Sequence, residues 1–196
     1  MFKVSNQLCK IVSVTNVSEK HGKDRVPALS IGLYLVGSGS MLDQFDAALR
    51  PMLYRKPQPT PGGLPLEYDD NELTELRFPF MRNLAWDRKY AGYLLCFRIG
   101  ASGVDDVLLA ECGLKDIRFV AQEGGSVGIA FKVTAHPKDE IDHGRIATRL
   151  QQEIFIDLTP PDRMPTLFDG HPDEEQDGER DPFENSDLAQ DESRID

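Results

Sequence analysis

The chain has 196 residues, of which 40% are hydrophobic and 28% are charged, and its formal net charge is −11 at pH 7. This composition suffices for one domain with a real hydrophobic core. No apolar run is long enough to cross a bilayer, and the N-terminus lacks the basic-then-apolar layout of a secretory signal, so we expect a cytoplasmic protein without membrane contact.

The negative charge is concentrated at the C-terminus. Residues 161–196 contain thirteen Asp or Glu and three Arg, a net charge of −10, which leaves −1 for residues 1–160. A strongly acidic segment cannot bury enough apolar surface to offset its ordering entropy. We therefore predict an ordered domain over residues 1–160 and a disordered acidic tail over residues 161–196.

Two alternating apolar runs open the domain. They predict a strand over Leu8–Val17 and a second over Leu29–Leu35, paired as an antiparallel hairpin. The segment between them, Ser18–Arg25, predicts a long charged loop with a turn at Gly22. Positive charge at the tip of this loop suits either a solvated loop or contacts to phosphate, and the basic residues are Lys20, Lys23 and Arg25.

A helix is expected next, over residues 40–50. Ser40 is a suitable N-cap, Arg50 lies near the negative end of the helix dipole, and Pro51 marks the stop. An apolar stripe would pack on a sheet or plug the end of a barrel, and it consists of Leu42, Phe45 and Leu49. The Pro- and Gly-rich stretch Arg55–Pro65 then predicts an exposed, extended loop.

Strand patterns return after residue 73. Alternation predicts strands over Thr74–Phe80, Tyr93–Ile99, Val107–Ala110 and Ile154–Leu158. The clearest pattern is a β-hairpin over Lys115–Ala135, in which Glu123-Gly124-Gly125 reverses the chain because glycine readily adopts positive φ. The stretch His136–Gly144 predicts a polar loop.

About eight strands and one helix, separated by regular turn signals, predict a mainly β fold. The chain lacks the βαβ alternation of a doubly wound nucleotide-binding fold. We expect an antiparallel β-sandwich or an OB-like barrel with one α-helix, followed by the disordered acidic tail. An edge strand left unpaired would allow a homo-oligomer.

Common catalytic signatures are missing from the sequence. It contains no GxxxxGK[ST] or GxGxxG phosphate cradle, no GxSxG elbow and no HExxH zinc motif. We therefore expect no catalytic residues, no bound metal and no cofactor, and a protein that is not an enzyme. The alternative is a metal-dependent hydrolase whose ligands lie on the polar loop, at His136, Asp139, Glu140, Asp142 and His143. The same composition also suits a loop that is simply solvated.

The cysteines are odd in number, and none belongs to a CxxC pair. They lie in or at the end of strand-like runs, at Cys9, Cys96 and Cys112. This pattern predicts reduced, packed thiols rather than disulfides or a zinc site.

Aromatic and basic residues alternate at one place in the domain. The group interleaves two aromatic with two basic side chains, and its members are Trp86, Arg88, Lys89 and Tyr90. Proteins that bind single-stranded nucleic acid combine cations with aromatic side chains on which bases stack. The alternative is that Trp86 packs in the core.

The tail contains two short hydrophobic motifs. The first resembles the peptides by which bacterial proteins dock on the sliding clamp, although Met164 replaces the usual Gln, and it includes Leu167 and Phe168. The second resembles the acidic end of bacterial single-stranded-DNA-binding proteins, although it is internal here, and it includes Pro182 and Phe183. Such motifs are typical of docking segments that order on binding, whereas a purely solubilising tail remains the alternative.

Four blocks of sequence carry a wider resemblance. They are EKHGKDRVPALSIGLYL, LRPMLYRKP, LRFPFM and AQEGGSVGIAFKVTAHP, within residues 5–160. These blocks resemble a family of uncharacterised phage and prophage proteins associated with replication and recombination genes. The resemblance implies a context in phage DNA metabolism and transfers no catalytic residues.

The leading hypothesis is an accessory protein of phage DNA metabolism. Its β domain would bind single-stranded DNA, and its acidic tail would recruit a host or phage replication or recombination protein. The second hypothesis is a protein-interaction module, such as an inhibitor of a host enzyme, that makes no nucleic-acid contact.

Overall fold

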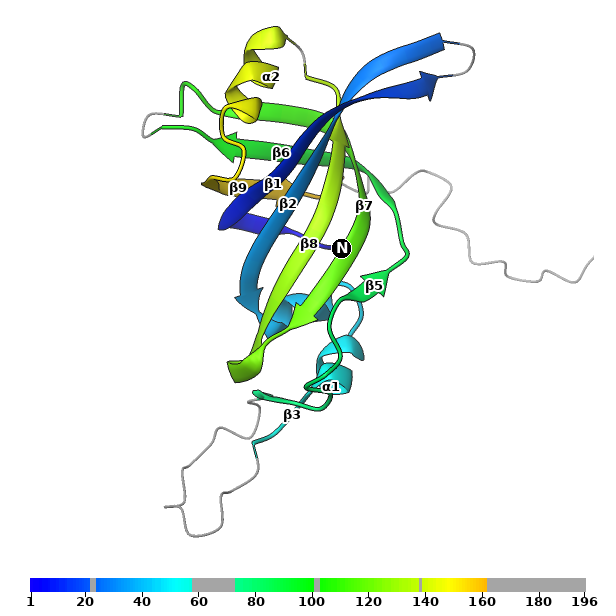
Figure 1. Cartoon of the computed structure of the whole chain (residues 1–196), viewed down its shortest axis with the longest axis vertical. Coiled ribbons are helices and arrows are strands. Elements are labelled where there is room, and N and C mark those ends of the chain that lie inside the picture. The colour runs from blue at the N-terminus through cyan, green and yellow to red at the C-terminus, as the bar shows by residue number, and fades with distance from the viewer. Residues whose placement is uncertain (22–23, 58–72, 101–102, 138, 162–196) are drawn as a thin grey trace, which may run out of the picture. The chain divides into compact units, whose positions relative to one another are not determined.

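Six antiparallel strands close into a barrel in the order β7, β6, β9, β1, β2, β8 and back to β7 (Figure 1). The computed structural model describes residues 1–21, 24–57, 73–100, 103–137 and 139–161, which belong to one unit, Met1–Pro161. The barrel strands are β1 (Val4–His21), β2 (Asp24–Ser38), β6 (Tyr90–Arg98), β7 (Val107–Ala121), β8 (Ser126–Ala135) and β9 (Glu153–Thr159). The predicted mainly β fold is confirmed, and the architecture is a closed barrel rather than a sandwich.

The remaining elements are short. The strand β5 (Leu84–Trp86) pairs with β7, while β3 (Tyr54–Arg55) and β4 (Glu75–Leu76) form a separate two-stranded sheet. The helical segments are η1 (Gly39–Gln44), α1 (Leu49–Leu53), η2 (Glu123–Gly125) and α2 (Glu140–Ala147).

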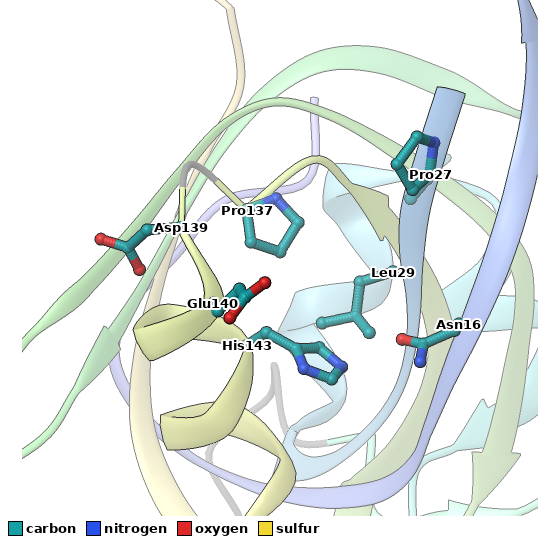
Figure 2. A pocket seen from close by; sticks show the side chains of 8 residues that line it. Asn16, Pro27, Leu29, Pro137, Asp139, Glu140 and His143 are labelled. Atoms are coloured by element: carbon teal, nitrogen blue, oxygen red, sulfur yellow. The ribbon is translucent and has the colours of Figure 1, made fainter. Parts of the chain in front are cut away.

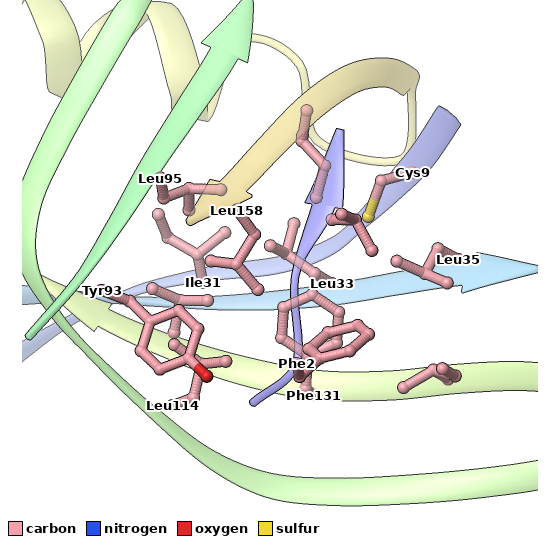
Figure 3. Packing of buried hydrophobic residues seen from close by; sticks show 14 of the residues in the cluster. Phe2, Cys9, Ile31, Leu33, Leu35, Tyr93, Leu95, Leu114, Phe131 and Leu158 are labelled. Carbon is pink, nitrogen blue, oxygen red and sulfur yellow. The ribbon is translucent and has the colours of Figure 1, made fainter. Parts of the chain in front are cut away.

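The inward-facing residues of the strands fill the barrel. Successive side chains of a strand point to opposite faces, so every second residue enters the interior. In β2 these positions are each at most 1% exposed, as predicted, and they are Leu29, Ile31, Leu33 and Leu35. Figure 3 shows such side chains from β1, β2, β6 and β9 converging on one core with Phe2.

The central hairpin is confirmed. The strands β7 and β8 pair from Gly113 opposite Thr134 to Ala121 opposite Val127. The turn between them includes Gly124, whose φ of 80° suits glycine. The separate strand predicted over Val107–Ala110 is the first part of β7, which runs without interruption to the turn.

The long loop predicted over Ser18–Arg25 is wrong. The strands β1 and β2 continue to the pair His21 and Asp24, whereas β2 pairs with β8 only as far as Leu29 opposite Ala135. Beyond that point β1 and β2 form a two-stranded arm that projects from the barrel (Figure 1). Backbone pairing alone can extend a hairpin, so such an arm needs no alternating apolar residues.

The helix predicted over residues 40–50 is divided into η1 and α1. Between them the Asp46 carboxylate accepts a hydrogen bond from the Ala48 N–H at 2.8 Å, and such local bonds compete with a continuous helix. Pro51 lies within the first turn of α1 instead of ending the helix, because that position needs no N–H donor. The predicted apolar stripe is nevertheless packed, since Leu42 is 0% exposed.

Two further predictions after residue 73 are wrong. The strand expected over Thr74–Phe80 is reduced to β4, and a turn follows in which the Met81 N–H bonds to the Phe78 carbonyl at 3.0 Å. The expected polar loop contains the helix α2, which begins where the Asp139 carboxylate accepts from the Asp142 N–H at 2.8 Å. Asp139 is thus an N-cap, a helix-start signal that is present in the sequence itself.

No helix among the described residues is both long enough and apolar enough to cross a bilayer. The predicted acidic tail lies, from residue 162 onward, outside the described residues.

Candidate nucleic-acid interface

The outer surface of β7 carries a bulge between Lys115 and Arg118. At the bulge Asp116 adopts a left-handed φ of 55°, and Lys115 lies directly opposite Lys132 of β8. Ile117 is buried, whereas the side chains of Asp116 and Arg118 are exposed. Because a bulge sets two residues against one on the partner strand, it brings Lys115 and Asp116 together beside Lys132.

A single carboxylate therefore lies among three cations. The Lys132 ammonium group lies 2.7 Å from an Asp116 carboxylate oxygen. This hydrogen bond, together with the charges of Lys132, Lys115 and Arg118, holds the pKa of Asp116 below its usual value. Like charges opposite each other destabilise a sheet, so fold stability does not explain why Lys115 faces Lys132.

The surface beside these charges is hollow, and three of the residues that line it are small: Ser13, Gly32 and Ala130. A cavity of about 280 Å³ lies between Arg118 and Lys132. A Cβ atom on Gly32 would lie only 2.4 Å from the Ser13 Oγ, so a larger residue at this position would displace its neighbour. We call this surface the basic groove, formed by Ser13, Gly32, Lys115, Asp116, Arg118, Ala130 and Lys132.

An aromatic residue lies next to the groove. Tyr34 of β2 is opposite Ala130, and its ring is so close to Gly128 that an added Cβ there would lie 2.4 Å from the Tyr34 hydroxyl. The ring is half-buried, and its hydroxyl accepts a hydrogen bond from the Gln122 side-chain amide at 3.3 Å.

A second and larger cavity follows farther along β8. We call it the end cavity; its volume is about 530 Å³, and its lining includes Lys89, Tyr90, Glu111, Lys115, Thr134 and His136. Lys115 connects the two cavities: it lines the end cavity, and it lies opposite Lys132, which lines the basic groove. Two of the predicted nucleic-acid-binding residues, Lys89 and Tyr90, therefore lie beside the basic groove.

The other two residues of that predicted group make contacts within the protein. Trp86 donates from its indole N–H to the Tyr90 hydroxyl at 3.0 Å and packs against Phe119 in the core. The Arg88 guanidinium lies over the Tyr90 ring, 5.4 Å from its centre. Trp86 therefore packs against the core, the alternative to base stacking, and Arg88 covers a face of the Tyr90 ring on which a base would stack.

The remaining predicted contact residues are only partly described. The backbones of Lys20 and Arg25 pair with each other in the β1–β2 arm, while Lys23 lies outside the described residues. The four predicted docking residues of the tail also lie outside them, at Leu167, Phe168, Pro182 and Phe183.

The segment predicted as a possible metal site lines another cavity, shown in Figure 2. This cavity has a volume of about 530 Å³ and lies between α2 and the base of the arm, with Asn16, Glu140 and His143 among its lining residues. Its described lining contains no Lys or Arg, so it does not extend the basic groove. The described residues contain no group of three or more His, Cys, Asp or Glu side chains that could hold a metal ion.

The thiols are free, as predicted. Burial raises the pKa of both Cys9 and Cys112 to about 12, which keeps these thiols protonated and unreactive. Cys96 is half-buried on β6, and its pKa is also raised, mainly by burial.

No protein-family model, no curated protein and no solved structure matches the chain. Its function is therefore inferred from the residues and the geometry of the barrel.

Proposed function

We propose that this protein binds single-stranded DNA along the basic groove, as an accessory factor of phage or prophage DNA metabolism. The observation that carries the proposal is the position of Asp116 among Lys115, Arg118 and Lys132, where three cations accompany one carboxylate. The surplus of positive charge is what a phosphate backbone neutralises when it binds a protein. In the same proposal, the acidic tail recruits a replication or recombination partner.

The shape of the groove supports a single strand as the ligand. Its floor of Ser13, Gly32 and Ala130 lets a sugar–phosphate backbone approach the sheet closely. Tyr34 stands at the side of the groove, and proteins that bind single strands combine cationic grooves with such aromatic side chains. Cations, a small-residue floor and an aromatic ring thus occur together on one face of the barrel.

Fluorescence anisotropy with a labelled single-stranded oligonucleotide tests this proposal. The oligonucleotide should have about 20 nucleotides, more than the roughly 4–16 that one OB-type barrel covers. We expect Lys115→Ala and Arg118→Ala to weaken binding and to reduce the salt slope, d log K/d log[salt], by about 0.7 in magnitude for each lost phosphate contact. The matched control is Lys3→Ala, which removes an exposed lysine outside the groove and should leave both quantities nearly unchanged.

Two outcomes would overturn the proposal. One is the absence of binding by the wild-type chain up to tens of micromolar protein at low salt. The other is an equal loss of affinity in the groove variants and in Lys3→Ala, since binding would then depend on net charge alone.

A second candidate function, protein interaction without nucleic acid, is favoured by a different face. Leu8 of β1 pairs with Phe155 of β9 and is adjacent to Val36 of β2, and these side chains are 40%, 46% and 43% exposed. Exposed apolar residues in neighbouring strands are typical of partner-binding surfaces. A partner that survives nuclease treatment, is lost in Phe155→Ser and is kept in Arg118→Ala would support this function, whereas unchanged binding in Phe155→Ser would exclude this surface.

A further inference from the structure

Thr134 is the only buried polar residue, tyrosine and cysteine aside, in the described part of the chain. It is 6% exposed, and its hydroxyl makes no hydrogen bond with any described residue. A buried hydroxyl without a partner costs free energy, and folded proteins seldom leave one in that state. Thr134 lines the end cavity, and because its hydroxyl oxygen is covered, a small rearrangement of the side chain would let a ligand there accept its hydrogen bond.

The charges around this hydroxyl indicate the chemistry of such a ligand. Lys89 and Lys115 also line the end cavity, opposed by the carboxylate of Glu111. Two ammonium groups and a hydroxyl donor suit an anion that carries several acceptor oxygens. His136 adds a ring whose Nδ1 lies 3.2 Å from the Pro27 carbonyl, and because a carbonyl only accepts, this nitrogen carries the proton.

The end cavity also lies where the basic groove stops. Outward-facing residues follow one another along β8 from Ala130 through Lys132 to Thr134. Just past the end of β8, His136 contacts Pro27, which belongs to the arm. The base of the arm therefore lies against His136 at this end of the groove, and a strand that follows the groove would reach this cavity.

From this geometry we propose that the end cavity binds a phosphomonoester, the group carried by the terminus of a nucleic-acid strand or by a free nucleotide. A phosphomonoester carries about −1.5 to −2 charges near pH 7 and three terminal oxygens. An internal phosphodiester carries one charge and two such oxygens, so it makes less use of two lysines and a hydroxyl. Binding of a strand terminus at this site rests on the proposed function, whereas binding of a free nucleotide does not depend on it.

The experiment compares oligonucleotides of one sequence that carry a 5′-phosphate, a 3′-phosphate or only hydroxyl termini, and adds adenosine monophosphate as a free nucleotide. We expect one phosphorylated strand to bind roughly tenfold more tightly than the unphosphorylated strand, the gain typical of one or two charge-assisted hydrogen bonds. Thr134→Val preserves the shape of the side chain and should abolish this preference without weakening binding of the unphosphorylated strand. Thr159→Val, on β9, is the matched control and should retain the preference.

The outcomes separate this inference from the proposed function. Equal affinity for all three strands, in the wild-type chain, would exclude a strand terminus as the ligand of this site while leaving single-strand binding intact. If no strand binds, the proposed function fails. The site then stands only if adenosine monophosphate shifts the amide resonance of residue 134 in the wild-type chain but not in the Thr134→Val variant. The absence of that shift, together with the absence of a terminal preference, would overturn the inference.

Discussion

Two core tyrosines differ in whether the hydroxyl has a hydrogen-bond partner, and stability measurements can isolate this difference. Tyr54 and Tyr93 are both 0% exposed. The Tyr54 hydroxyl donates to the Ser126 carbonyl and accepts from the Gln122 N–H at 3.3 Å, which ties β3 to the β7–β8 turn. The Tyr93 hydroxyl lies near the Phe2 backbone but makes no hydrogen bond of normal geometry with any described residue.

The replacement of each tyrosine by phenylalanine should therefore have different effects. In Tyr54→Phe the Ser126 carbonyl keeps its bond from the Gln122 N–H at 2.9 Å, so no buried acceptor is left alone, and the free energy of unfolding should fall by about 1 kcal/mol. In Tyr93→Phe an unpaired buried hydroxyl disappears, so the free energy of unfolding should stay constant or rise by up to about 1 kcal/mol. For a domain of this size, 1 kcal/mol corresponds to about 2–4 °C in Tm.

Urea denaturation and thermal unfolding of the wild-type chain and both variants would measure these differences. Equal m-values in urea would show that the variants unfold between the same two states. A loss of stability in Tyr93→Phe as large as that in Tyr54→Phe would refute the reasoning, because the hydroxyl of Tyr93 would then have a partner in solution.

The other predictions concern the charges, the thiols and the tail. Asp116→Asn should tighten oligonucleotide binding in anisotropy titrations, since it removes the anion among three cations, and should change stability by no more than about 0.5 kcal/mol; weaker binding would contradict this. At about pH 8 a thiol reagent should react with Cys96 before Cys9 and Cys112, which should react only on unfolding. Immediate labelling of all three cysteines would contradict the burial. Because burial raises the folded pKa of Cys9 and Cys112, the contribution of these two thiols to the free energy of unfolding should persist below about pH 9 and decline as the pH rises toward 12. Deletion of residues 162–196 removes ten net negative charges and should tighten DNA binding at low salt, with the difference shrinking as salt is added; unchanged binding in stopped-flow and equilibrium titrations would exclude such an electrostatic effect of the tail.

The strands of the barrel could be predicted because their pattern is local. Alternation from Leu29 to Leu35 and from Val127 to Ala135 marks one buried face, and the glycines at 124 and 125 mark the turn. The extent of the arm could not be predicted this way, because its charged residues carry no apolar alternation, and the structure extends it by backbone pairing. The predictions of the helical segments failed for another reason: a local turn at Asp46 divides the first helix, and side-chain capping by Asp139 sets the start of α2.

Two residues of the candidate site could be found in the sequence. Lys89 and Tyr90 belong to a visible cluster of basic and aromatic residues, and they line the end cavity. The cations Lys115, Arg118 and Lys132 are separated along the chain, and only the cross-strand register and the bulge bring them together. The position of the turn predicts approximate pairing between β7 and β8, but a bulge shifts the register by one residue, and no local sequence pattern identified it.

The central claim is that the outer face of β7 and β8 contacts nucleic acid. Amide resonances of the isotope-labelled full-length chain, followed during titration with a single-stranded oligonucleotide, would test it most directly. The account predicts that the largest shifts occur at Lys115, Arg118 and Lys132, and that they disappear at high salt. Shifts confined to the face around Leu8 and Phe155, or no shifts at any residue, would contradict it.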